Sequence, residues 1–233
     1  MTPVSFIQEF GKFLQEINIS AKQNAEKLHS SYGWTEKDIR VAFFNTISET
    51  AFTHGLTIYL IDTEILKNKN NWRESQEYFL PTRNDVFERL LKTYPFQIRD
   101  NFFFDFIMHL EDILRIFAEK IIFFINDSIS VVKDQLIKIF ALDLEYKNLL
   151  DVLFKFRNTI HNGGLHSETK PSKTFKGNVF NFTAKKFSQS GLDNLDYLFK
   201  EVFNFMNELF NHSLSTDVSF VGHPYEFFVQ PSS

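Results

Sequence analysis

The stretch LEYKNLLDVLFKFRNTIHNGG, residues 144–164, decides how this chain is expected to fold. Its apolar residues recur every three or four positions, which is the periodicity of an amphipathic helix. One seam of the helical wheel holds four of them: Leu149, Leu153, Phe156 and Ile160. Gly163 follows, and glycine is common just after the last turn of a helix. The stretch therefore predicts a helix over 144–162, with Asp143 as its N-cap.

Two basic residues of this helix do not share its polar side. That side holds six residues: Lys147, Asn148, Asp151, Lys155, Asn158 and Asn162. Arg157 and His161 fall instead beside Tyr146, Leu150 and Phe154, on a second apolar flank. Because a buried cation needs a partner or loses its charge, we expect the pair to face another helix, a cleft or a second subunit.

Helical periodicity also covers most of the first 70 residues. Apolar residues at helical spacing over 7–28 predict a long first helix. A second helical region is expected over 36–66, with Thr35 as its N-cap and an interruption near Gly55. The sequence KNKNNW, residues 67–72, predicts a polar loop.

The same periodicity predicts helices in the rest of the chain, which makes the expected fold all-α. A short helix over 84–93 is expected to stop at Pro95, since proline lacks the backbone N–H that a helix interior needs. The very apolar stretch 100–124 predicts a central, mostly buried helix. The next helix should end near Phe140, and a last amphipathic helix is expected over 192–214.

One segment departs from helical periodicity. In KTFKGNVFNFTAK, residues 173–185, Phe180 and Phe182 alternate with polar or smaller residues. Gly177–Asn178 is a pair suited to a tight turn. We therefore expect a small β-hairpin after the helix that carries Arg157. Nothing resembles a linker that would mark a domain boundary, so a single domain over 1–233 is expected.

Composition and charge narrow the classes of function. With a net charge of -4, the chain has no general attraction for nucleic acid, and RNA binding would need a local basic patch. The absence of cysteine excludes disulfides, thiolate zinc sites and cysteine nucleophiles. The first residues include Glu9 and Glu16 and are not expected to form a signal peptide. No apolar run reaches about 18 residues, so we expect a cytoplasmic protein without a membrane partner.

Motifs of the large enzyme classes do not occur in the sequence. It contains no GxxxxGK[ST], GxGxxG, HExxH, paired ExxH or GxSxG pattern. These patterns would indicate phosphate loops, dinucleotide sites, helical metal sites and serine hydrolases. No cofactor and no metal site are therefore expected.

Arg157 and His161 allow two interpretations. Basic residues in the last turn of a helix interact well with its dipole, and a four-residue spacing is common to all helix neighbours. Alternatively, the arginine fork can hold a phosphate, and the histidine can exchange a proton near neutral pH. Together they could hold a phosphodiester and assist attack by an RNA 2′-hydroxyl, a reaction that needs no metal.

The segment RNTIHN, at a helix end in a predicted all-α domain, resembles the HEPN superfamily, the higher eukaryote and prokaryote nucleotide-binding domains. The hallmark of that family is R-x(4–6)-H near a helix end in a four- or five-helix bundle. The spacing here, R-x(3)-H, is one residue shorter. The resemblance implies a HEPN-type helical bundle that dimerises at the motif. It also implies either a metal-independent endoribonuclease of a toxin–antitoxin or phage-defence system, or an inactive RNA-binding or scaffolding module.

The resemblance also implies roles for individual residues. Arg157 corresponds to the phosphate-holding residue, Asn158 to an orienting residue and His161 to the general acid/base. Asn162, at the helix end, could cap carbonyls or contact a ligand. Glu111 is spaced for an ion pair with Arg115, and the other interpretation is that it pairs with Arg157 or orients His161 from a neighbouring helix.

The other basic residues are expected mainly to have structural roles or to lie in solvent. His109 is expected to be structural, and His166 to be a solvated loop residue that could reach a phosphate. The lysines around the hairpin form either a solvated surface or a lip that guides RNA: Lys173, Lys176, Lys185 and Lys186.

The sequence thus favours a bacterial RNA-cleaving or RNA-binding protein, with an antitoxin or defence-system protein as an expected partner. The alternative is a non-catalytic helical module for dimerisation or protein contact. A homodimer is expected in both cases, because the flank with Leu150 and Phe154 would be a large apolar patch if left in water. Asn158, on the polar side, should be dispensable for folding.

Overall fold

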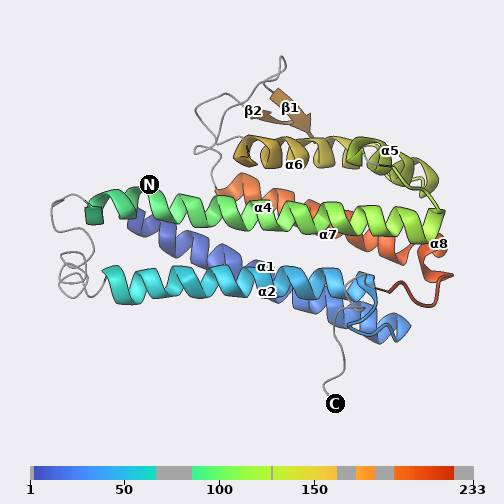
Figure 1. Cartoon of the computed structure of the whole chain (residues 1–233), viewed down its shortest axis with the longest axis horizontal. Coiled ribbons are helices and arrows are strands. Elements are labelled where there is room, and N and C mark those ends of the chain that lie inside the picture. The colour runs from blue at the N-terminus through green and yellow to red at the C-terminus, as the bar shows by residue number, and fades with distance from the viewer. Residues whose placement is uncertain (1–2, 67–85, 127, 162–171, 182–191, 223–233) are drawn as a thin grey trace.

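Four long helices form the body of the protein. The computed structural model describes residues 3–66, 86–126, 128–161, 172–181 and 192–222. Its helical bundle consists of α1 (Pro3–Tyr32), α2 (Ile39–Leu60), α4 (Val86–Ile122) and α7 (Leu192–Asn211) (Figure 1). A π-helical segment, η1 (Ile61–Leu66), continues α2. The predicted long first helix and last helix are confirmed.

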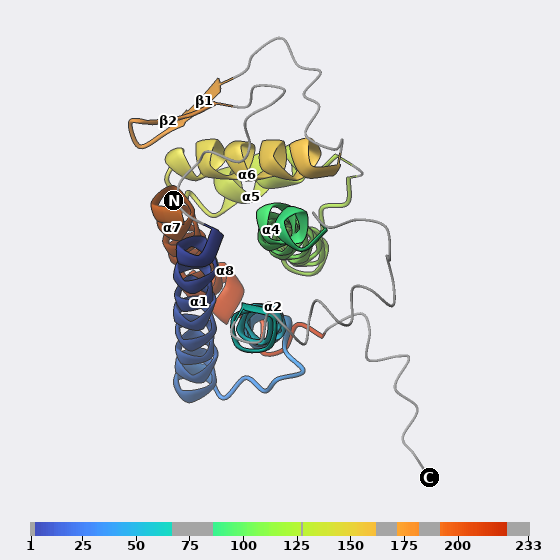
Figure 2. The ribbon, with the colours of Figure 1, turned by 90° about the vertical axis from the view of Figure 1, so that its left-hand side faces the viewer.

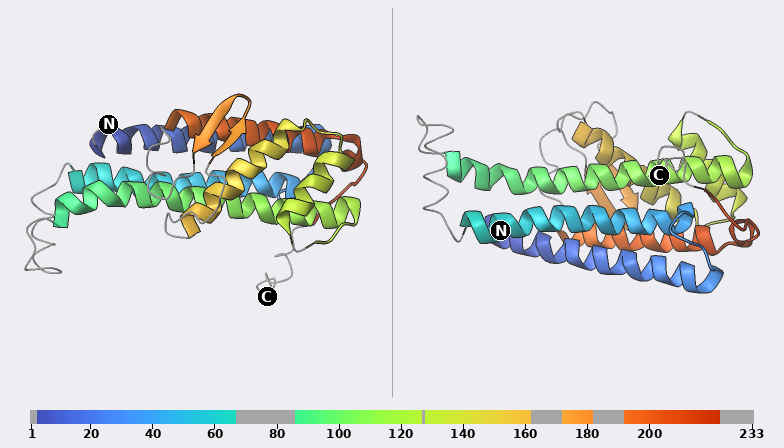
Figure 3. Two further views of the ribbon diagram at one scale, coloured as in Figure 1. Left: turned by 90° about the horizontal axis from the view of Figure 1, so that it is seen from above. Right: turned by 60° about the horizontal axis from the view of Figure 1, so that its bottom comes forward.

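Two shorter helices and a hairpin cover one side of this bundle. Helices α5 (Ile129–Ile139) and α6 (Glu145–His161) lie on α4 and α7, opposite α1 and α2 (Figure 2). The strands β1 (Ser172–Phe175) and β2 (Asn178–Asn181) pair antiparallel beyond α6, and Figure 3 shows α6 running obliquely across the bundle beneath them. A short helix, α8 (Ser213–Thr216), follows α7. The prediction of a helical bundle with one small hairpin is confirmed.

Phenylalanine rings fill the centre of the bundle. The ring of Phe199 on α7 packs on Phe106 at 4.1 Å, Phe103 at 5.3 Å and Phe102 at 5.5 Å between centroids, all three on α4. Phe13 on α1 meets the same ring edge-on at 5.4 Å. Aromatic pairs at these separations add about 0.5–1.5 kcal/mol beyond the area that they bury. One cluster of buried side chains joins the helices of the bundle to α5, α6 and the hairpin.

The start of α2 is fixed by a buried ion pair, and its predicted N-cap is wrong. The helix begins at Ile39 with Asp38, not Thr35, as its N-cap. Asp38 accepts bonds from the backbone N–H of Arg40 at 3.0 Å and from its guanidinium at 2.5 and 2.7 Å. Arg40 also donates to the carbonyl oxygens of Ser215 and Val218, and both charged side chains are fully buried. The pair therefore ties α2 to the chain after α7.

Two predicted breaks do not occur. Helix α2 runs through Gly55, and α4 runs through Pro95, so residues 86–93 of the expected separate helix are part of α4. An interior glycine costs about 1 kcal/mol of helix stability and an interior proline about 3 kcal/mol. Burial of the residues around them offsets these costs, because α4 buries Ile98, Phe102 and Phe103 just after the proline.

The hairpin turns one residue earlier than predicted. Phe175 pairs with Asn178, which leaves Lys176 and Gly177, not Gly177 and Asn178, at the turn. Both turn residues have positive φ, 42° and 78°, as a type I′ hairpin turn requires.

Several predictions fall outside the described residues. These are the loop over 67–72, Gly163 and His166, and the hairpin residues Phe182, Lys185 and Lys186. Among the helices that the structure describes, none is long and apolar enough to cross a membrane.

Candidate site at the end of helix α6

Helix α6 has the predicted N-terminal cap and the predicted apolar seam. The Asp143 carboxylate accepts the backbone N–H of Glu145 at 2.9 Å, which satisfies a donor left free at the helix start. Leu149, Leu153 and Phe156 of the seam are buried. The C-terminal residues of α6 are thus held by a helix that is packed along its length.

The second apolar flank of α6 is buried within the same chain. Leu150 is fully buried and Phe154 is 7% exposed. Tyr146 packs its ring on Phe205 of α7 at 5.1 Å and donates its hydroxyl to Glu208 at 2.5 Å. The argument that this flank needs a second copy to cover it is therefore wrong, because α7 and the rest of the bundle already cover it.

The predicted polar side of α6 is covered in part, while Lys147 and Asn158 on it are exposed. Lys155 is 8% exposed, and Asp151 binds Lys133 of α5 and Lys173 of β1. Burial lowers the pKa of Lys133 to about 8. The hairpin thus packs on the side of α6 that the helical wheel had assigned to solvent.

The two described hairpin lysines are paired with acids. Lys173 donates to Asp151 at 2.9 Å, and Lys176 donates to Glu201 at 2.7 Å. Because a paired lysine offers less net charge to a phosphate, these two contacts do not favour the hypothesis of an RNA-guiding lip.

Glu111 links the two arginines that the sequence had offered as alternative partners. From α4, its Oε1 accepts from Arg115 Nη2 at 2.8 Å, and its Oε2 accepts from Arg157 Nη1 of α6. Glu111 therefore pairs with both arginines at once, while its expected role in orienting His161 stays a prediction. The carboxylate is 9% exposed, against 32% for Arg115 and 22% for Arg157. It is a nearly buried anchor for two partly exposed cations.

The guanidinium of Arg157 is held on two edges. Its Nη1 donates to Glu111, and its Nε donates to Asn158 Oδ1 at 3.2 Å. Within the described part of the chain, its Nη2 donates to no hydrogen-bond partner. A planar cation with two braced edges and one remaining donor group can bind an oxyanion without first rearranging.

The structure brings together three of the five predicted site residues: Arg157, Asn158 and Glu111. Asn158 is exposed, as expected for a residue that is dispensable for folding. His161 is the last residue of α6, so its backbone lies one helical turn beyond Arg157. Its side chain and all of Asn162 lie outside the description. His109 lies on α4, partly buried, and among the described residues no group of three or more acidic or histidine side chains could hold a metal.

Sequence reasoning missed an apolar surface on α2. Its exposed members are Phe52, Leu56, Tyr59 and Leu60. The signal was present, because these residues recur at helical spacing in addition to the buried seam of the same helix.

Replacing Glu111 with glutamine should destabilise the protein. The change removes the negative charge between Arg115 and Arg157 and leaves two cations facing a neutral group. We expect the free energy of unfolding to fall by about 1.5–3 kcal/mol, measured by urea denaturation. Glu119→Gln, at an exposed ion pair with Lys120 of the same helix, is the control and should change stability by less than about 1 kcal/mol. Equal losses in both variants would show that Glu111 is not an anchor.

Comparisons with known proteins assign no role to these residues. No protein-family model matches the chain, and no curated protein or solved structure matches it. The resemblance of RNTIHN to the HEPN motif therefore stays an expectation.

Proposed function

We propose that this protein is a HEPN-like, metal-independent endoribonuclease that holds a phosphodiester on Arg157 and uses His161 as its general acid/base. One observation carries the proposal: the Arg157 guanidinium is braced by Glu111 and Asn158, is partly exposed, and keeps an unengaged Nη2 within the described part of the chain. An arginine with a purely structural role would be expected to donate its N–H groups to acceptors within the protein.

The brace explains how Arg157 could act on a phosphate. Arg115 donates to Glu111 through Nε and Nη2 and also donates Nη1 to the carbonyl of Asn126, so the carboxylate is itself fixed. A fixed carboxylate in turn limits the orientations open to Arg157. Preorganised donors stabilise a developing negative charge better than mobile ones, because they need no reorganisation during the reaction.

The proposed reaction is an internal transesterification of RNA. Neutral His161 accepts the proton of the 2′-hydroxyl, and the 2′-oxygen forms a bond to the adjacent phosphorus. The bond from phosphorus to the 5′-oxygen breaks, and the imidazolium returns its proton to that oxygen. The products are a 2′,3′-cyclic phosphate and a 5′-hydroxyl, while Arg157 balances the charge on the non-bridging oxygens.

The charge of the protein sets the character of RNA binding. The net charge of -4 and the acidic partners of Lys173 and Lys176 offer little general attraction to a polyanion. We therefore expect binding through few phosphate contacts, with a shallow dependence on salt. The resemblance suggests a toxin–antitoxin or phage-defence setting, in which a partner protein would restrain the ribonuclease.

Arg157→Ala should weaken binding of single-stranded RNA at least about tenfold, since it removes the proposed phosphate contact. Fluorescence anisotropy with a labelled RNA measures the affinity, and circular dichroism checks that the variant stays helical. Lys200→Ala removes the same charge from an exposed residue of α7 and should bind like the wild type. The proposal fails if the wild type binds no RNA or if both variants lose affinity equally.

A second candidate function is a non-catalytic interaction module. The exposed apolar side chains on α2 favour it, because a surface of this kind often marks a protein contact. Such a role would not require Arg157 to contact a phosphate.

A further inference from the structure

Helix α2 exposes a stripe of large apolar side chains. Phe52 and Tyr59 are each 61% exposed, Leu56 is 47% exposed and Leu60 is 48% exposed. At about 100° per residue, the four side chains lie within about 100° of each other around the helix. They form one continuous surface, named here the α2 stripe, rather than scattered apolar residues.

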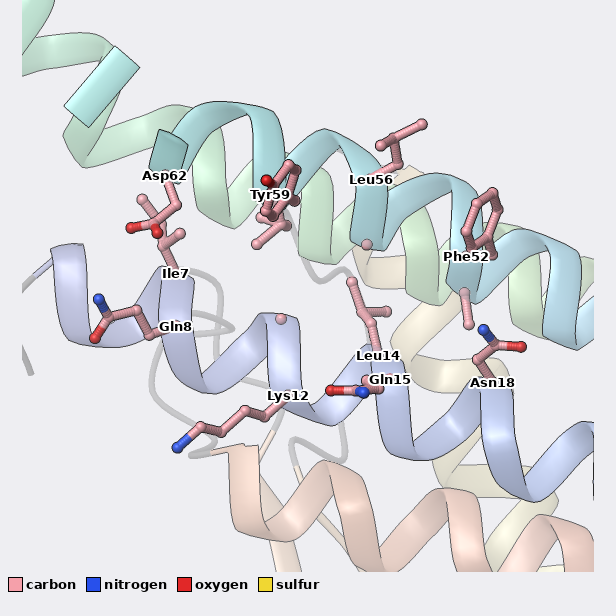
Figure 4. Close-up of a pocket in the computed structure, with 14 residues that line it drawn as sticks. Ile7, Gln8, Lys12, Leu14, Gln15, Asn18, Phe52, Leu56, Tyr59 and Asp62 are labelled. Atoms are coloured by element: carbon pink, nitrogen blue, oxygen red, sulfur yellow. The ribbon is translucent and has the colours of Figure 1, made fainter. Parts of the chain in front are cut away.

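A groove runs beside this stripe, between α1 and α2. It has a volume of about 730 Å³, and small residues, Gly11, Ala51 and Gly55, lie along it. Figure 4 shows Gln8 and Lys12 on α1 across the groove from Tyr59 on α2. A Cβ added to Gly11 would lie 3.3 Å from Ile58, so the two helices approach closely at the floor of the groove.

The α2 stripe and the groove are complementary to themselves. Phe52, Leu56 and Leu60 follow one another at intervals of four residues, so the pattern is symmetric about Leu56. A two-fold axis beside Leu56 would set two α2 helices antiparallel and place Phe52 of one copy against Leu60 of the other. Each ridge would then lie along the groove of the other copy, as ridges pack into grooves between helices.

We propose that the α1–α2 face is the interface of a homodimer, with Leu56 of the two copies meeting at the two-fold axis. The occupant of each groove is thus α2 of a second copy. This interface lies on the opposite side of the bundle from α6 (Figure 2), so both Arg157 side chains stay outside it. The proposal does not depend on ribonuclease activity, and it replaces the dimer that the sequence had suggested through Leu150 and Phe154.

The apolar area is adequate for the centre of such an interface. An aromatic side chain offers about 150–250 Å² for burial, so Phe52 and Tyr59 of two copies would remove on the order of 500 Å² from water. A standard interface buries about 1,200–2,000 Å² in all. The remainder would come from the leucines and from the polar wall of Gln8, Lys12 and Gln15, which matches an apolar centre with a polar rim.

Light scattering after size exclusion tests the proposal. The wild type should elute as a dimer at about 100 µM chain, and Leu56→Glu should weaken dimerisation at least about 100-fold, because it sets two like charges at the axis. Leu144→Glu, at a 75% exposed leucine before α6, is the matched control and should stay dimeric. Circular dichroism verifies that both variants are folded. A monomeric wild type at this concentration, or a dimer unaffected by Leu56→Glu, would overturn the proposal.

The absence of cysteine allows a second test that does not depend on the stability of a charged variant. Leu56→Cys introduces the only thiol of the chain, and mild oxidation should convert it rapidly to a covalent dimer, since the two sulfur atoms would meet at the axis. Leu144→Cys should crosslink far more slowly, at the rate of chance encounters. Equal rates for the two positions would place the interface elsewhere.

Discussion

Replacing Asp38 with alanine should lower the free energy of unfolding by about 3–5 kcal/mol, because it leaves a buried arginine without its counter-charge. Arg40 is fully buried, donates twice to this carboxylate, and lies 3.4 Å from the centre of the Trp34 ring. The same carboxylate accepts the backbone N–H of Val221 at 3.0 Å. Its loss therefore leaves several buried groups unsatisfied at once, and urea denaturation measures the cost.

Asp143→Ala is the matched control for this prediction. Asp143 also accepts a backbone N–H at a helix start, but it is exposed and has no buried arginine as partner. Its removal should cost about 0.5–2 kcal/mol, the usual contribution of an N-cap. If Asp38→Ala costs no more than Asp143→Ala, the buried ion pair does not stabilise the fold. A double variant with Arg40→Leu should recover part of the loss, because no unpaired charge remains.

Removing the proposed general acid/base should have the largest effect on activity. We expect His161→Ala to slow RNA cleavage by about 10²- to 10⁴-fold, the usual contribution of a positioned proton donor and acceptor. RNA affinity should stay near that of the wild type, because Arg157 and its brace by Glu111 are untouched. Single-turnover cleavage and fluorescence anisotropy separate the two effects.

His109→Ala provides the histidine control. His109 lies on α4, two residues before Glu111, and has no role in the proposed chemistry. Its replacement should leave the cleavage rate unchanged. A wild-type rate for His161→Ala would remove the assigned role of that histidine, whatever the behaviour of Arg157.

The helices were predictable because apolar residues recur at helical spacing. The residues at which the helices begin and end were less predictable. Pro95 and Gly55 were expected to interrupt helices on local preference alone. That preference amounts to about 1–3 kcal/mol, and packing of neighbours such as Phe102 and Phe103 against the bundle exceeds it. The N-cap was assigned to Thr35 because the contacts that fix Asp38 reach the chain after α7. Asp38 accepts the backbone N–H of Val221, and its partner Arg40 donates to the carbonyl of Ser215, which no local pattern reveals.

The surroundings of the candidate site were only partly predictable. A helical wheel shows which residues of α6 share a side, but not what covers each side. It could not show that α7 covers Tyr146, or that Asp151 binds lysines from α5 and β1. The Glu111–Arg157 pair joins residues that are 46 positions apart, so the sequence offered it only as one of two interpretations. The structure shows that one carboxylate serves both arginines.

Analysis of RNA ends tests most directly the central claim that Arg157 and His161 cleave RNA without a metal. Purified wild-type protein is incubated with mixed RNA in EDTA, and the new ends are identified chemically, with His161→Ala treated in parallel. The account predicts 2′,3′-cyclic phosphate and 5′-hydroxyl ends from the wild type and a large loss of both from the variant. Intact RNA after incubation with the wild type, or new ends bearing a 3′-hydroxyl and a 5′-phosphate, would contradict it.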